Sequence, residues 1–270
     1  IQARGFLIGG TAGRTTLNGE GLQHQDGHNL LMANTIPNCV SYDPTYAYEV
    51  AVIVHDGMKR MYEQQENVFY YLTAMNENYQ HPALPEGAEE GIIKGMYKLK
   101  QGGKHKLKAQ LLGSGTILRE VEAAAEMLEK DWKVAATVWS ATSINELTRD
   151  GQEVDRFNRL NPGADKKQSY VAQCLDDEPG VVVAATDYIR IYAEQIRPWI
   201  KAPYTVLGTD GFGRSDTREK LRSFFEVDRY HVVVATLSTL AEQGDIKPDV
   251  VADAIKKYDI NVEAINPVKA

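Results

Sequence analysis

Cysteine and long apolar runs are both scarce in this sequence. The two cysteines, Cys39 and Cys174, lie far apart among 270 residues, which excludes a disulfide framework and a CxxC metal or redox motif. No stretch approaches the roughly 20 apolar residues of a bilayer span, and the N-terminus lacks the basic-then-apolar pattern of a signal peptide. These absences predict a cytoplasmic protein that does not associate with membranes.

The charge balance also limits the partners. A formal net charge of -7 gives an average surface that repels phosphate backbones, so we expect no nucleic acid partner. Five lysines between Lys98 and Lys108 form a local basic run, but glycines interrupt it. This run favours a solvated loop over a phosphate site.

The composition is that of an ordinary globular protein. Hydrophobic residues make up 43% and charged residues 25% of the chain, and 270 residues are enough for two cores. The chain begins with Ile1, not methionine, directly before a glycine-rich motif, as a partial sequence or a proteolytic product would.

The first part of the chain predicts strands on either side of one helix. We expect strands at residues 5–8, 36–42 and 67–74, the first of them followed by a glycine-rich loop. After Thr45, apolar residues recur at helical spacing and predict a face made of Tyr46, Val50, Ile53, Val54, Met58 and Met61. The opposite, polar face is predicted to carry Glu49, Asp56, Lys59 and Arg60.

A polar, proline-containing stretch at residues 75–85 predicts a linker and a domain boundary. Beyond it, strands or apolar runs at 107–112, 134–140, 181–185 and 204–207 alternate with helical patterns at 116–130, at 143–159, around Tyr188 to Ile196 and toward the C-terminus. Such alternation is typical of α/β units around a mainly parallel sheet.

Reactive side chains are densest in a glycine-rich loop that contains Arg14, Glu20, His24, Asp26 and His28. One interpretation is a metal site, but two histidines four residues apart converge reliably only on a helix, which the glycines disfavour. A second is general acid–base catalysis by His24, with Glu20 or Asp26 setting its tautomer. A third is that these residues bond only local backbone. The pattern alone leaves all three open.

Two other loops carry possible chemistry. Residues 113–115 (GSG) lie between a strand and a helix, but the full GxGxxG fingerprint is absent, so a tight turn is favoured over a phosphate site. Residues 208–219 contain Asp210, Arg214 and Asp216, and either Ser215 or Asp216 could cap a helix that starts near Thr217. A structural loop is favoured there, with a buried Arg/Asp network at a subunit contact as the alternative.

Six segments, in order, carry a family resemblance. They are GFLIGGTAGRTTLNGEGLQHQDGH, IPNCVSYDPTYAYEVAVIVHDGMKRMY, MNENY, LPEGAEEGI, QLLGSG and GTDGFGRSDTRE. Over essentially the whole chain, the sequence resembles the homodimeric bacterial type of pyruvate dehydrogenase. The resemblance implies transketolase-like, three-layer α/β sandwiches with mainly parallel sheets. Residues 1–84 would be the C-terminal half of the pyrimidine-binding domain and residues 85–270 the C-terminal domain, so that the chain is the C-terminal portion of such an enzyme.

The resemblance also implies a reaction and its residues. Thiamine diphosphate, held with Mg²⁺, would allow pyruvate to be decarboxylated and the lipoyl group of dihydrolipoyl acetyltransferase to be reductively acetylated. His24 matches a family histidine at the substrate end of the active site and would act as general acid/base. Glu20 would orient it, and Arg14, Asp26 and His28 would support the loop. The cofactor-binding residues are unknown and expected upstream, and no metal ligands are expected in this chain.

The implied partners are a second copy of the chain, pyruvate, and the acetyltransferase with its lipoyl domain. A different class of function is a non-catalytic module for dimerisation or assembly, inactive in isolation. A third hypothesis is a related transketolase-like enzyme that acts on another 2-oxo acid.

Overall fold

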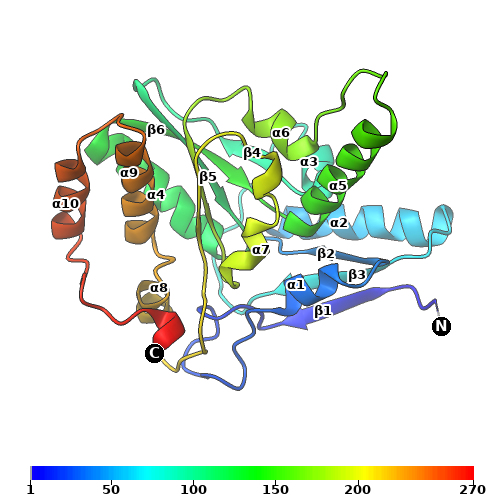
Figure 1. Ribbon diagram of the computed structural model, residues 1–270. Helices are drawn as coiled ribbons and strands as arrows, with labels where there is room; N and C mark the ends of the chain where they lie inside the picture. Colours follow the sequence, from blue (N-terminus) through cyan, green and yellow to red (C-terminus); the bar gives the residue numbers. More distant parts are fainter. Residues whose placement is uncertain (1) are drawn as a thin grey trace.

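The computed structural model describes residues 2–270, which form two β-sheets surrounded by helices (Figure 1). Both sheets are mainly parallel, so the predicted α/β class with mainly parallel sheets is confirmed. Within residues 2–270, no helix is both long enough and apolar enough to cross a bilayer.

The smaller sheet consists of three parallel strands in the order β1-β3-β2. They are β1 (Phe6–Gly10), β2 (Cys39–Tyr42) and β3 (Phe69–Ala74). All three were predicted, but β2 begins later than expected. After helix α1 (Asn29–Asn34) the chain turns, with the amide of Cys39 bonded to the carbonyl of Ile36, and the first contact with β3 is the hydrogen bond from the amide of Phe69 to the carbonyl of Asn38.

Helix α2 (Ala47–Met58) continues into the π-helical turn η1 (Lys59–Glu63). The prediction for its faces was wrong at Glu49, which is fully buried, and at Val50 and Met58, which are exposed. The Glu49 carboxylate accepts hydrogen bonds from the amides of Thr45 and Tyr46 at the helix start, and from the hydroxyls of Tyr97 and Ser140. A buried charge is tolerated where so many donors converge.

The larger sheet has five strands in the order β4-β6-β5-β7-β8. They are β4 (Tyr97–Lys100), β5 (Leu107–Gly113), β6 (Val134–Ser140), β7 (Val181–Ala185) and β8 (Tyr204–Leu207). All neighbours are parallel except β4, which pairs with β6 in the antiparallel sense at the edge. Every residue of β6 and β7 is buried, as expected for strands covered on both faces.

Part of the lysine run therefore belongs to strands, and the loop prediction was wrong there. Lys98 and Lys100 lie on β4 and Lys108 on β5, whereas Lys104 and Lys106 lie in the connection. Lys98 forms an ion pair with Glu178 and lies over the ring of Trp139. Side chains alternate along β4, so that Lys98 and Lys100 point toward solvent at the edge of the sheet. Charge at such an edge discourages pairing with a further strand.

Helices cover both faces of the larger sheet and complete three layers (Figure 1). On one face lie α4 (Ile117–Trp132) and α9 (Arg229–Glu242), with α10 (Pro248–Lys257) packed on α9. On the other lie α5 (Ile144–Leu160), α6 (Tyr170–Leu175) and α7 (Arg190–Glu194). The amphipathic patterns of α4 and α5 gave their bounds to within two residues. The pattern around Tyr188 to Ile196 overstated α7, because Tyr188 belongs to the preceding loop.

Residues 75–88 contain no helix or strand, as predicted, and lead into α3 (Glu89–Lys94). Ile92 of α3 and Tyr97 pack into the hydrophobic core of the smaller sheet with Ile53, Tyr70 and Leu72. The segment after the predicted linker thus contributes to the first core as well as to the second. The short elements α1, α3, β4 and α6 were not predicted from the sequence.

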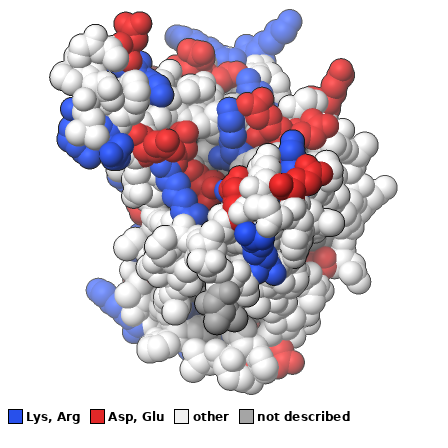
Figure 2. All heavy atoms as spheres, turned by 90° about the vertical axis from the view of Figure 1, so that its right-hand side faces the viewer, with Lys and Arg blue, Asp and Glu red and all other residues white. Residues whose placement is uncertain are grey.

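The surface seen in Figure 2 carries Lys, Arg, Asp and Glu side chains intermixed over its upper half, whereas its lower half is largely uncharged. No extended basic area is visible on this face. Exposed apolar side chains of the N-terminal part of the chain include Leu7 and Ile8 on the edge strand β1 and Met32 on α1.

Candidate functional site

Loops that follow the carboxyl ends of strands in both sheets meet at one junction. The amide of Arg14, after β1, bonds to the carbonyl of Asp187, after β7, at 3.3 Å. The amide of Gly115, after β5, bonds to the carbonyl of Asp43, after β2, at 3.1 Å. In open α/β sheets, the loops at the carboxyl ends of strands are where ligands bind. The junction is therefore the place to look for a site.

The loop after β1, residues 11–28, places His24 and Glu20 together. His24 Nε2 lies 3.6 Å from Glu20 Oε2, and the two side chains are 56% and 50% exposed. No helix brings them together; a turn does so, in which the His24 amide bonds to the carbonyl of Gly21. An accessible imidazole beside a carboxylate can both accept and donate a proton.

The other residues predicted for this loop lie elsewhere. Arg14 is only 3% exposed and donates from Nη1 to the carbonyls of Thr209 and Gly211, while its Nε has no partner. Burial lowers the pKa of its guanidinium, an effect that Asp210 partly offsets. Asp26 accepts from the amides of His28 and Asn29 at the start of α1, and the His28 side chain is exposed. Arg14 and Asp26 thus fix backbone, and neither contacts His24.

Two fully buried carboxyl groups lie at the junction, and the sequence analysis missed both. Asp187 accepts from the amide of Thr15 and the hydroxyl of Thr16, and burial raises its pKa. Asp43 accepts from the hydroxyls of Thr73 and Tyr188 through Oδ1, while its Oδ2 has no partner. Burial raises the pKa of Asp43 to about 6. No sequence motif indicated these two residues, because each is a single aspartate that follows a strand.

The pKa of Asp43 predicts a dependence of stability on pH. A carboxyl group whose pKa is raised by folding stabilises the fold while it is neutral, and this contribution is lost as the pH rises from about 4 through 6. Asp43→Asn stays neutral at every pH. We expect its free energy of unfolding, relative to the unmodified protein, to rise by about 2 kcal/mol between pH 4 and pH 7, as measured by urea unfolding.

The control for this experiment is Asp165→Asn, since Asp165 is exposed. Its stability should follow the unmodified protein in parallel at all pH values. A constant difference between Asp43→Asn and the unmodified protein across this range would show that Asp43 does not titrate as expected.

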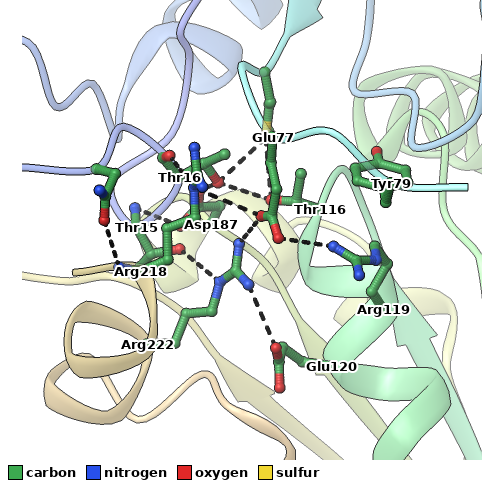
Figure 3. A network of polar contacts seen from close by, with 12 residues as sticks. Thr15, Thr16, Glu77, Tyr79, Thr116, Arg119, Glu120, Asp187, Arg218 and Arg222 are labelled. Atoms are coloured by element: carbon green, nitrogen blue, oxygen red, sulfur yellow. Dashed lines mark hydrogen bonds and ion pairs between the residues drawn. The ribbon is translucent and has the colours of Figure 1, made fainter.

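A network of ion pairs surrounds Glu77 beside the junction (Figure 3). Glu77 lies in the segment predicted as a linker, and its carboxylate contacts Arg222 at 2.5 Å, Arg119 at 2.7 Å and Arg218 at 3.9 Å. Arg222 also reaches Glu120 at 3.4 Å and the hydroxyl of Thr15 at 3.3 Å. This network joins the segment after β3 to α4 and to α8 (Arg218–Phe224).

Electrostatics in this network keep both carboxylates ionised. Burial alone would raise the pKa of Glu77, but its hydrogen bond to Arg222 and the nearby arginine charges lower it below the usual value. The same balance, with Arg229 as the main partner, lowers the pKa of Glu120. The sequence analysis missed these residues, because arginines and glutamates scattered over 150 positions give no local signal.

The loop before α8 differs from the prediction in its cap and in its ion pairs. Thr217, and neither Ser215 nor Asp216, is the N-cap, and its hydroxyl accepts from the amide of Lys220. Asp210 pairs with Arg190. The alternative of a buried Arg/Asp network at a subunit contact stays a prediction.

The donor set of the described residues does not fit the metal and diphosphate end of thiamine diphosphate. No group of three or more His, Cys, Asp or Glu side chains among residues 2–270 converges as a metal site. His24 and His28 therefore belong to no such group. The Gly113 to Gly115 turn carries buried side chains at Ser114 and Thr116, and the hydroxyl of Ser114 faces that of Thr186.

Two family models match the chain. The pyruvate dehydrogenase E1 component middle domain matches residues 1–82, and the transketolase-like C-terminal domain matches residues 95–228. The chain is 63% identical over 269 residues to the pyruvate dehydrogenase E1 component of Pseudomonas aeruginosa, and 60% identical over 268 residues to that of Escherichia coli K12. These matches cover 99% and 98% of this chain, and 30% of each relative.

Solved transketolases share the fold. The transketolase of Campylobacter jejuni superposes with a TM-score of 0.62 at 16% identity, over 86% of this chain and 31% of that one. A split-gene transketolase described as an inactive tetramer gives 0.56 at 19% identity, over 87% of this chain and 67% of that one. The chain spans about 30% of the length of the curated relatives that it matches. It belongs to the pyruvate dehydrogenase E1 component family of transketolase-like proteins.

Proposed function

We propose that this chain is part of a pyruvate dehydrogenase that decarboxylates pyruvate and reductively acetylates the lipoyl group of dihydrolipoyl acetyltransferase. The exposed His24–Glu20 pair, on a loop at the carboxyl end of β1, is the observation that carries the proposal for this chain. The high identity to relatives named pyruvate dehydrogenase E1 component supports the reaction class.

In this proposal His24 acts as general acid/base and as hydrogen-bond donor to the substrate oxygen or the lipoyl sulfur. An imidazole can deliver and remove a proton near neutral pH, and the exposure of His24 leaves it free to reach a substrate. Glu20, 3.6 Å away, orients the ring. Arg14, Asp26 and His28 act indirectly: Arg14 ties the loop to the carbonyls of Thr209 and Gly211, Asp26 holds the backbone at the end of the loop, and His28 lies at that end.

The rest of the enzyme is part of the same proposal. Thiamine diphosphate with Mg²⁺, when bound, supplies the electron sink for decarboxylation. Residues 2–270 include no group of donors that converges as a metal site, so we expect the metal and diphosphate ligands from other parts of the polypeptide. We further propose a cytoplasmic homodimer that engages the acetyltransferase.

We also propose a division of the chain at residue 84, into part of the pyrimidine-binding domain and the C-terminal domain. The confinement of the smaller sheet to residues 6–74 and of the larger one to residues 97–207 supports this division. Ile92 belongs to the second unit by this division but packs into the core of the first, so the two units are in contact there.

The reaction is tested by comparing the full-length gene product with this chain alone. The full-length protein should release carbon dioxide from labelled pyruvate and acetylate a lipoyl domain. The chain alone should release none and should give no heat on titration with thiamine diphosphate and Mg²⁺, because its donor groups do not fit them.

The control is the full-length protein with 2-oxobutyrate in place of pyruvate. Turnover of 2-oxobutyrate at least as fast as of pyruvate would move the assignment to another 2-oxo acid. Carbon dioxide release by the chain alone would overturn the division of labour proposed here, and a full-length protein inactive on both substrates would leave only an assembly role.

A further inference from the structure

Two segments far apart in the sequence lie side by side next to His24. We call residues 14–28 the His24 loop and residues 208–218 the clasp segment. The carbonyl of Asp216 accepts from the amide of Gly19 at 3.0 Å. Arg218 donates through Nε to the carbonyl of Thr16 at 2.7 Å. Figure 1 places the two segments together, blue against yellow-brown, at the lower edge of the molecule.

Gln25 makes the most complete contact between the two segments. Its amide donates from Nε2 to the carbonyl of Arg214 at 2.5 Å, and its Oε1 accepts from the amide of the same residue at 2.7 Å. The side chain thus satisfies both polar groups of one residue in the clasp segment, as a paired strand would. Gln25 is 7% exposed, whereas His24 beside it is 56% exposed. The Gln25 side chain is therefore fixed in the interior, whereas the neighbouring His24 side chain is exposed to solvent.

Two glycines permit this close approach. A Cβ at Gly213 would lie 2.7 Å from Gln25 Oε1 and 2.9 Å from Gln25 Cβ. The φ of Gly21 is +93°, in the left-handed region, and a Cβ there would collide with Ser215 Oγ. Both segments are therefore shaped for this contact.

The clasp segment is itself held by helices that pack on the larger sheet. Asp210 accepts from the amide of Arg190 at 2.9 Å and pairs with its guanidinium. At the other end, Arg218 begins α8, which the Glu77 network ties to α4 through Arg222. A glycine-rich loop without regular secondary structure gains a fixed geometry only from such external supports.

We propose that Gln25 is a positioning residue, which transmits the fixed geometry of the clasp segment to the imidazole of His24. The inference rests on the proposed catalytic role of His24 and deepens it. Misplacing a catalytic group by about an ångström slows a reaction substantially while substrate affinity is kept. Loss of the Gln25 contacts should therefore lower kcat and leave KM for pyruvate nearly unchanged.

The test uses Gln25→Met in the full-length gene product, because methionine keeps the size and removes both hydrogen bonds. We expect kcat to fall about tenfold. Amide hydrogen exchange should become faster in residues 18–28. Gln25→Glu, which still accepts from the amide of Arg214, should recover part of the loss. Gln152→Met, on the exposed side of α5, is the matched control and should change neither quantity.

A double-mutant cycle separates this inference from the proposed function. If Gln25 acts through His24, Gln25→Met should have no further effect in a His24→Ala background. Additive effects, or a normal kcat for Gln25→Met where His24→Ala is impaired, would overturn the positioning role and leave the role of His24 intact. If His24→Ala itself is fully active, the proposed function of His24 fails, and unchanged hydrogen exchange in Gln25→Met would then overturn the clasp as well.

Discussion

His24→Ala should lower the turnover of pyruvate by the full-length gene product by about 10²–10⁴, the usual contribution of a general acid or base. The imidazole is exposed next to Glu20, and the only other histidine of residues 11–28 is His28, the N-cap residue of α1. Alanine removes the proton donor and acceptor, and the arginines nearby cannot replace it because they stay protonated. The measurement is steady-state formation of acetylated lipoyl domain.

Two controls show whether this loss is chemical. Because His24 is exposed, its replacement should change the free energy of unfolding by no more than about 0.5 kcal/mol. His105→Ala, in the connection between β4 and β5, should keep the normal rate. A His24→Ala enzyme with a near-normal rate would remove His24 from the mechanism.

Glu77→Ala should lower the free energy of unfolding by about 3 kcal/mol or more. Its carboxylate is the shared partner of Arg119, Arg218 and Arg222, and the Arg222 side chain is only 7% exposed. Removing one member of a buried ion pair leaves the other charge without compensation in a medium of low polarity. Chemical denaturation at neutral pH, where Glu77 is ionised, measures the effect directly.

The matched control is Glu126→Ala, on the exposed side of α4. Glu126 pairs with Lys100 but is 70% exposed, so its loss should cost less than about 1 kcal/mol. Replacing Arg222 by methionine in the Glu77→Ala background should restore part of the stability, because it removes a buried charge that has lost its nearest partner. Equal small effects of Glu77→Ala and Glu126→Ala would show that the network is not a structural support.

The regular elements were predictable where the pattern is local. Both β6 and α5 were predicted almost residue by residue, since the apolar run of β6 and the helical period of α5 each lie within the segment itself. The short elements failed for the converse reason. β4 is four residues long and rich in lysine, and it forms only because β6 offers it an edge.

Sequence patterns also assigned Glu49 and the lysines of β4 to the wrong environments. Helical periodicity assigned Glu49 to the solvent side, but donors from Tyr97 and Ser140, more than 45 residues away, make its burial favourable. Charge and glycine content assigned Lys98 to a loop, but Glu178 and Trp139 hold it at the sheet edge. In each case the partner that decides the outcome lies outside any window that a sequence pattern can use.

By itself, the sequence determined the fold class, the glycine-rich loop with its reactive side chains, and the family resemblance, because all three are written in neighbouring residues. Tertiary structure alone decided which of those side chains is presented and what holds the loop. The contact of Gln25 with Arg214 spans 189 positions, and that of Glu77 with Arg222 spans 145. Such pairs exist only once packing of the two sheets has brought the carboxyl ends of their strands together.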